Sequence, residues 1–120
     1  MVDLHNTKNL IGGQLVASET GRYFESVNPA NEQVIGRAPE GSTADMNRAV
    51  DAALGARRAW AALSITDRAK YLRELASALT EHAETILKIE VMDTGNTIAE
   101  MKMDVQSGVD QLHYYAGIGH

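Results

Sequence analysis

STADMNRAVDAALGARRAWAAL, residues Ser42 to Leu63, is where the hydrophobic pattern of the chain becomes helical. Its apolar residues recur at steps of three and four, the period of an amphipathic α-helix. Ser42 is followed by Asp45 three positions later, a spacing typical of a capping box at a helix N-terminus. We therefore predict that the helical part of the chain begins at Ser42. The apolar stripe of this first helix consists of Met46, Ala49, Val50, Ala53, Trp60 and Leu63.

The same capping spacing recurs further along the chain. Ser64 with Asp67, and Thr97 with Glu100, each precede another stretch of helical period. Gly95 suits the position just past a helix C-terminus, where left-handed backbone geometry favours glycine. We predict three to four helices over residues 42–120, the number depending on a break between Thr80 and Ala83.

Residues 1–41 have the pattern of short strands and turns. Gly12-Gly13 lies between two short apolar pairs, and two central glycines with positive φ are typical of a two-residue hairpin. Further strand candidates are Tyr23–Val27 and Val34–Ala38. We predict an α+β chain, in which a small antiparallel hairpin or meander over residues 1–41 precedes the helices of residues 42–120. These parts together form a single partial domain over residues 1–120.

Composition and charge exclude several classes of function. The formal net charge is −5 and the basic residues are scattered, which argues against nucleic acid as a partner. The absence of cysteine excludes a disulfide, a thiolate metal site and a cysteine nucleophile within these residues. No apolar run reaches the ~20 residues that span a bilayer, and no secretory signal is visible. We therefore expect a cytoplasmic protein without a membrane partner.

The small size of the apolar residues predicts a marginal core. Much of the 44% hydrophobic fraction is alanine, which buries little area. We expect that the core is either small or completed by another chain or by further sequence. The histidines, His5, His82, His113 and His120, share no metal-ligand spacing and are interpreted as surface residues.

Two acids stand out against this background. Glu90 and Asp93 fall in the last helical turn before Gly95, where negative charge opposes the helix dipole at a cost of roughly 0.3–1 kcal/mol each. Three explanations remain open at this point: a basic side chain elsewhere neutralises them, Asp93 caps the next helix, or the acids help to bind a cation through oxygen ligands.

Several segments, taken in order, resemble the NAD(P)-dependent aldehyde dehydrogenase superfamily. The resemblance covers nearly the whole chain, and each motif is specific only in combination with the others. The matching segments are LIGGQLV (10–16), FESVNPA (24–30) with Val34-Ile35, AVDAA (49–53) with Trp60, DRA (67–69) with Leu72 and Leu75-Ala76, EVMDTG (90–95) and YYAG (114–117). The chain departs from the family at Asn96, where lysine is usual, and at His113, where arginine is frequent.

The resemblance implies a fold and a role. In the family this segment is the outer part of the cofactor-binding domain, and the complete enzyme oxidises an aldehyde to a carboxylic acid with NAD or NADP. The catalytic cysteine, the general-base glutamate, the oxyanion-hole asparagine and the cofactor-binding residues all come later in the family's sequence. We therefore expect no catalytic and no cofactor-binding residue here, no tight binding of NAD(P) and no activity from these residues alone. The expected partners are the remainder of the enzyme or a second copy, in a homo-oligomer.

Two kinds of site residue carry over from the resemblance. Many members bind a monovalent cation, K+ or Na+, through positions that correspond to Asp93 and to the backbone carbonyls of Ser26 and Val27. The helix that leads into Tyr114-Tyr115 lines the mouth of the family's substrate tunnel, which places Ser107 and Gln111 on its wall. The alternative for Ser107 and Gln111 is that they are ordinary solvated helix residues.

Two functional hypotheses follow. The first is that the chain is a segment of an oxidoreductase, and the absence of a polar tail after Gly119-His120 favours truncation. The second is a free-standing, truncated interaction module that self-associates or binds a full-length relative. The second hypothesis rests on the expectation that helices lacking the rest of their core expose apolar stripes.

Overall fold

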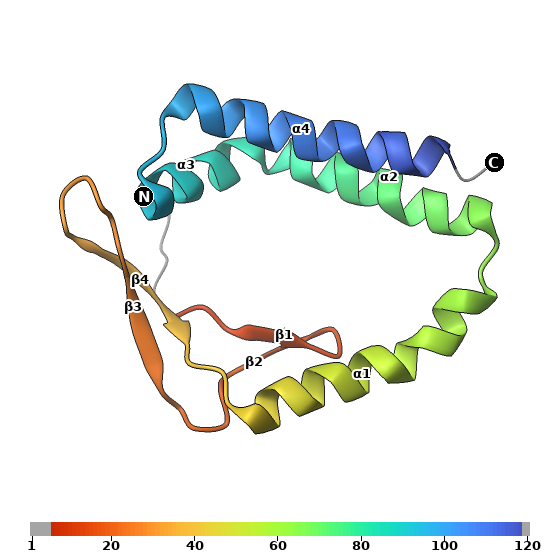
Figure 1. The fold of residues 1–120 in the computed structure, drawn as a ribbon, viewed down its shortest axis with the longest axis horizontal. Coiled ribbons are helices and arrows are strands. Elements are labelled where there is room, and N and C mark those ends of the chain that lie inside the picture. Colours follow the sequence, from red (N-terminus) through yellow and green to blue (C-terminus); the bar gives the residue numbers. More distant parts are fainter. Residues whose placement is uncertain (1–5, 119–120) are drawn as a thin grey trace. The chain divides into compact units, whose positions relative to one another are not determined.

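The structure is a computed structural model that describes residues 6–118, so His5 and His120 lie outside the described residues. Strands and turns come first and helices follow, as predicted for an α+β chain (Figure 1). The elements are β1 (Asn9–Ile11), β2 (Gln14–Val16), β3 (Tyr23–Val27), β4 (Val34–Pro39), α1 (Thr43–Ala62), α2 (Ile65–Glu81), α3 (Ala83–Thr94) and α4 (Ile98–Gly117). The described residues form two compact units, 6–61 and 62–118.

The hairpin predicted at Gly12-Gly13 is confirmed. Strands β1 and β2 pair antiparallel, with Leu10 opposite Leu15. Gly12 and Gly13 have φ angles of 59° and 78°, which a residue with a Cβ adopts only under strain. Both leucines are largely exposed, so the hairpin is held by its turn and its ladder and buries little apolar surface.

Strands β3 and β4 also pair antiparallel, but they form a second, separate sheet. The prediction of a hairpin or a meander is therefore confirmed in its hairpin form, as two separate strand pairs, and the strands lie where they were predicted. The physical reason lies in the connection from β2 to β3, where Ser18 and the amide of Glu19 bond to Asp45 of α1. These bonds hold the connection on α1, and no ladder forms between β2 and β3.

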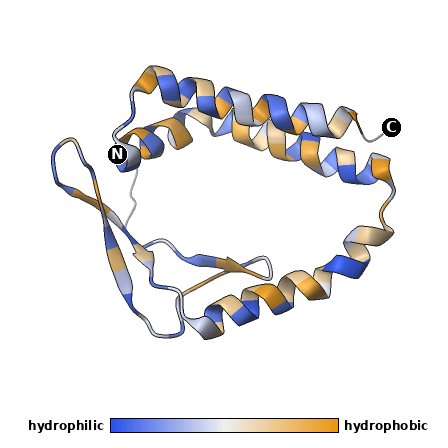
Figure 2. Cartoon of the chain, viewed as in Figure 1, coloured by the Kyte–Doolittle hydropathy of each residue, from blue (hydrophilic) through white to orange (hydrophobic). Residues whose placement is uncertain are grey.

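Helix α1 begins as its sequence predicted. The amide of Asp45 donates to Ser42 Oγ (3.1 Å) and the amide of Ser42 donates to Asp45 Oδ2 (2.9 Å), which is a reciprocal capping box. Asp45 is the one buried residue of the helix, all of which the structure describes. The apolar residues Met46, Val50 and Trp60 are 65%, 49% and 45% exposed. Apolar residues recur along the length of α1 (Figure 2), but they bury little surface.

The second unit is built on an antiparallel pair of long helices, α2 and α4 (Figure 1). Helix α2 stops at Glu81, and α3 begins immediately after His82, which confirms the predicted break. Among residues 6–118 the buried apolar side chains are Ala69 and Ala76 of α2 with Met101, Val109 and Ala116 of α4. No large side chain is fully buried in the described part, which agrees with the expectation of a marginal core.

Small residues allow the α2 and α4 backbones to approach closely at the buried alanines.

The other capping predictions are also confirmed, since the Asp67 amide donates to Ser64 Oγ (3.1 Å) and Thr97 with Glu100 forms a capping box. Each of these caps satisfies an amide that the helix itself leaves without an acceptor.

We predict opposite stability effects for two Gly→Ala substitutions in the second unit. Gly95 follows α3 with φ 75°, so Gly95→Ala should destabilise the protein by about 1 kcal/mol. Gly108 lies inside α4, and a Cβ there would meet nothing within 4 Å beyond the backbone of its own helix, so Gly108→Ala should stabilise the protein by roughly 0.5–1 kcal/mol. Urea unfolding followed by circular dichroism measures both changes, and equal signs would contradict the prediction.

Candidate functional site

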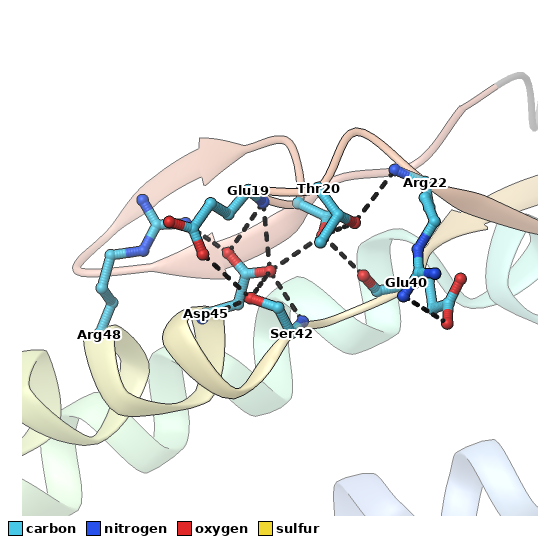
Figure 3. A network of polar contacts seen from close by, with 8 residues as sticks. Glu19, Thr20, Arg22, Glu40, Ser42, Asp45 and Arg48 are labelled. Atoms are coloured by element: carbon cyan, nitrogen blue, oxygen red, sulfur yellow. Dashed lines mark hydrogen bonds and ion pairs between the residues drawn. The ribbon is translucent and has the colours of Figure 1, made fainter.

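The most densely bonded group of the first unit is the Asp45 carboxylate, which is 3% exposed (Figure 3). Its oxygens accept from the Ser42 amide (2.9 Å) and hydroxyl (3.0 Å) and from the Ser18 hydroxyl (2.9 Å). The amide of Glu19 lies 3.1 and 3.2 Å from the two oxygens. The Arg48 guanidinium pairs with Oδ1 from the next turn of α1. This network therefore contains more donors than one carboxylate needs.

Ser18 connects this network to the end of β4. It is 4% exposed, and its hydroxyl lies 2.6 Å from the carbonyl oxygen of Glu40 as well as 2.9 Å from Asp45. Thr20 Oγ1 lies 3.2 Å from Ser18 Oγ and accepts from the Arg22 amide (3.2 Å). The β2–β3 connection, the end of β4 and the start of α1 are thus joined through one buried acid. The role of this arrangement is structural, since its donors are consumed within it.

Sequence reasoning found only part of this network. The spacing of Ser42 and Asp45 announced the capping box, but no local pattern pointed to Ser18, which is 27 residues from Asp45. A buried serine in a polar loop has no periodic signature. The one available signal was Asp45 in the first turn of α1, which both caps the helix and accepts from the β2–β3 connection. The second of these roles is visible only in the folded structure.

We predict that this network makes the stability of the protein sensitive to acid. The Ser42 amide is the largest of the causes that hold the pKa of Asp45 well below its ordinary value. Burial opposes this shift, and Arg48, Ser18 and the Glu19 amide add to it. Because the folded-state pKa is depressed, the contribution of Asp45 is complete above about pH 4, the ordinary range of an aspartate, and is lost as the pH falls below it.

Thermal unfolding of the protein and of Asp45→Asn between pH 7 and pH 2.5 measures this effect. The gap between their midpoints should be constant above about pH 4 and shrink below it. A gap that stays the same down to pH 2.5 would contradict the prediction.

The residues of the predicted cation site fall in both units. Ser26 is half-buried on β3 opposite Gly36, and Val27 is the last residue of β3, next to a β-bulge between Ser26 and Val27. Asp93 is exposed in the last turn of α3, in the second unit. The placement of Asp93 near the helix end, where no basic residue lies in the last turn, agrees with the sequence reasoning. The cation site itself stays a prediction.

The other acid of that turn, Glu90, borders a groove in the second unit. The groove has a volume of about 390 Å³ and lies between the end of α2, α3 and the first half of α4. Its lining comprises Leu79, Ile86, Glu90, Thr94, Asn96, Met101, Asp104, Val105 and Gly108. Among residues 6–118, no three or more His, Cys, Asp or Glu side chains are grouped as metal ligands would be.

The predicted tunnel-wall residues lie on one face of α4. Ser107 and Gln111 are one turn apart and both exposed, which fits a wall as well as a solvated surface. One turn further, the rings of Tyr114 and Tyr115 meet edge to face with centroids 5.3 Å apart, and both rings are more than half exposed.

None of the described helices has the length and apolarity required to cross a bilayer.

A family model described as the aldehyde dehydrogenase family matches residues 15–120. The chain belongs to the aldehyde dehydrogenase family. This agrees with the resemblance of the ordered motifs from the hairpin to Tyr114-Tyr115, and it covers both compact units.

Solved structures of aldehyde dehydrogenases match the fold closely. Lactaldehyde dehydrogenase from Escherichia coli is 32% identical with a TM-score of 0.90, over 93% of this chain and 24% of its own length. A NAD-dependent benzaldehyde dehydrogenase from Corynebacterium glutamicum is 29% identical with a TM-score of 0.89, over 94% and 25%. Betaine aldehyde dehydrogenase from Staphylococcus aureus, solved with NAD+, is 32% identical with a TM-score of 0.85, over 93% and 23%. The chain thus spans a quarter or less of the length of each of these aldehyde dehydrogenases.

Proposed function

We propose that this chain is the N-terminal segment of an NAD(P)-dependent aldehyde dehydrogenase, which in its complete form oxidises an aldehyde to a carboxylic acid. The observation that carries the proposal is the family match over residues 15–120, in a chain that covers only 22–25% of its solved relatives. The chain has no cysteine, so the thiolate that attacks the aldehyde in the resembling family has to come from elsewhere in the enzyme. The segment by itself is inactive in this proposal.

The local chemistry of the helix ends supports the further expectation that NAD(P) is held elsewhere. A pyrophosphate binds where the amides of a helix N-terminus are free to donate. In α1, α2 and α4 the first turn carries an acid, and a side chain of the chain itself accepts from the amides there. A dinucleotide would meet negative charge at these ends. Helix α3 has no side-chain cap, but its first turn also carries an acid, Glu84, so negative charge disfavours a pyrophosphate at its N-terminus as well.

In the proposed complete enzyme, a monovalent cation is held by the Asp93 carboxylate and the backbone carbonyls of Ser26 and Val27. Carboxylate and carbonyl oxygens are suitable ligands for such an ion. Ser107 and Gln111 form part of the wall of the substrate tunnel. Their exposure on one face of α4 supports this role.

The experiment that tests the proposal is the mass of the natural polypeptide, captured from source cells with an antibody to this segment. A polypeptide several times longer that contains a cysteine is expected, and it should reduce NAD+ or NADP+ when an aldehyde is added. In parallel, calorimetric titration of the 120-residue chain with NAD+ should give no saturable signal. A product that ends at His120, or saturable binding of NAD+ by the chain, would contradict the proposal.

The alternative function is a free-standing interaction module, and the exposed apolar residues of α1 favour it. Leu54 is 59% exposed and Met46 is 65% exposed, and such surface is usually covered by a partner. We expect the isolated chain to form a dimer or a larger assembly with itself. Light scattering across the micromolar range measures this, and a monodisperse monomer would exclude self-association.

A further inference from the structure

The C-terminal end of α4 is held by a residue from another helix. The last carbonyls of a helix have no partner within it, and they carry its negative dipole end. The last turn of α4 contains no basic residue to compensate for this. Across the helix pair, Nη1 of Arg73 on α2 lies 3.5 Å from the carbonyl oxygen of Ala116. A full positive charge from α2 thus lies at the negative end of α4.

The position of Arg73 on α2 explains how it reaches this carbonyl. Ala69 and Ala76, four residues before and three residues after Arg73, are both buried on the face of α2 that meets α4. Ala116 on α4 is 1% exposed, so its backbone also lies close to α2. The small side chains on either side let the two backbones approach, and the guanidinium of Arg73 reaches the Ala116 carbonyl across the helix pair.

We propose that Arg73 is a positioning residue, whose guanidinium fixes the last turns of α4 on α2 by charge. These turns carry Gln111 and the Tyr114–Tyr115 pair. The relevance of this positioning to a substrate tunnel rests on the proposed function. The contact itself does not depend on that function. Arg73 touches neither substrate nor cofactor, and it acts only through the α4 backbone.

Hydrogen exchange measured by mass spectrometry on the 120-residue chain tests the proposal. In Arg73→Gln, amides of residues 112–118 should exchange about two- to fivefold faster, while those of residues 98–106 keep their rates. Arg73→Lys retains the charge and should retain most of the protection. The matched control is Lys70→Gln, on the same helix, whose side chain is exposed and forms a 3.8 Å ion pair with Glu74.

Salt separates a charge effect from simple packing. At about 1 M salt the protection of residues 112–118 in the unchanged chain should fall towards that of Arg73→Gln, because exposed charges are then screened. The proposal is overturned if exchange rises evenly through residues 62–118, if it does not change, or if Arg73→Lys behaves as Arg73→Gln. The proposal is also overturned if salt does not change the difference in exchange rate between the unchanged chain and Arg73→Gln.

The tunnel role is tested separately, in the complete enzyme. There, Gln111→Ala should raise KM for the aldehyde more than it lowers kcat. Unchanged kinetics would reject the placement of Gln111 on the tunnel wall without affecting the exchange result. Failure of the exchange result would reject the role of Arg73 without affecting the placement of Gln111.

Discussion

Asp45→Ala is expected to lower the thermal midpoint of the unit that contains α1 by roughly 10 °C or more, because the amides of Ser42 and Glu19 lose a shared, buried acceptor. The Ser18 hydroxyl and the amides of Ser42 and Glu19 converge on the two oxygens of this carboxylate. Removing the acid also leaves the Arg48 guanidinium without the anion it pairs with. Trp60 is the single tryptophan and lies on α1, so its fluorescence reports this unfolding directly.

Asp51→Ala is the matched control for this substitution. Asp51 is an exposed acid one and a half turns further along the same helix, so its removal changes charge and helix propensity in nearly the same way. Surface substitutions of this kind are usually neutral to within about 0.5 kcal/mol. If the two variants unfolded at the same temperature, the network around Asp45 would contribute nothing beyond an ordinary surface acid.

Ala76→Leu is expected to destabilise the second unit by about 1–3 kcal/mol through overpacking. Ala76 is 0% exposed on α2, which packs against α4, and α4 buries Met101, Val109 and Ala116. A leucine there has to displace α4 or adopt a strained rotamer. Urea unfolding monitored at the helical circular dichroism band measures the change.

Ala78→Leu provides the control on the same helix. Ala78 is exposed, and alanine and leucine have nearly equal helix propensities, so this variant should unfold close to the unchanged chain. A similar loss of unfolding free energy in both variants would indicate a general effect of leucine on α2. No loss in Ala76→Leu would mean that the helices separate easily, and that the buried alanines do not hold them together.

Local sequence signals predicted the elements well. Each of the capping pairs acts within three residues, so the hydrogen bonds at Ser42, Ser64 and Thr97 follow from spacing alone. Gly12-Gly13 and Gly95 were readable for the same reason, because a positive φ is a property of a single residue. The ordered motifs were sufficient to identify the family, which the match over residues 15–120 confirms.

Signals that depend on distant residues were not readable in this way. Periodicity located the apolar stripe of α1, but periodicity does not say whether a face is covered, and the stripe is largely exposed. The choice between a hairpin and a meander stayed open in the sequence, because the pairing of β2 with β3 depends on where their connection is anchored.

The sequence by itself determined where helices and turns begin and end, and which family the chain belongs to, because caps, glycines and motif order are encoded within short spans. Only the tertiary structure decided that Ser18 is buried against Asp45, that the strands form two sheets, and that Arg73 reaches the end of α4. These features join residues that are 27 and 43 positions apart in two of the cases. No local pattern specifies such pairs, since they arise only when packed backbones bring the side chains together.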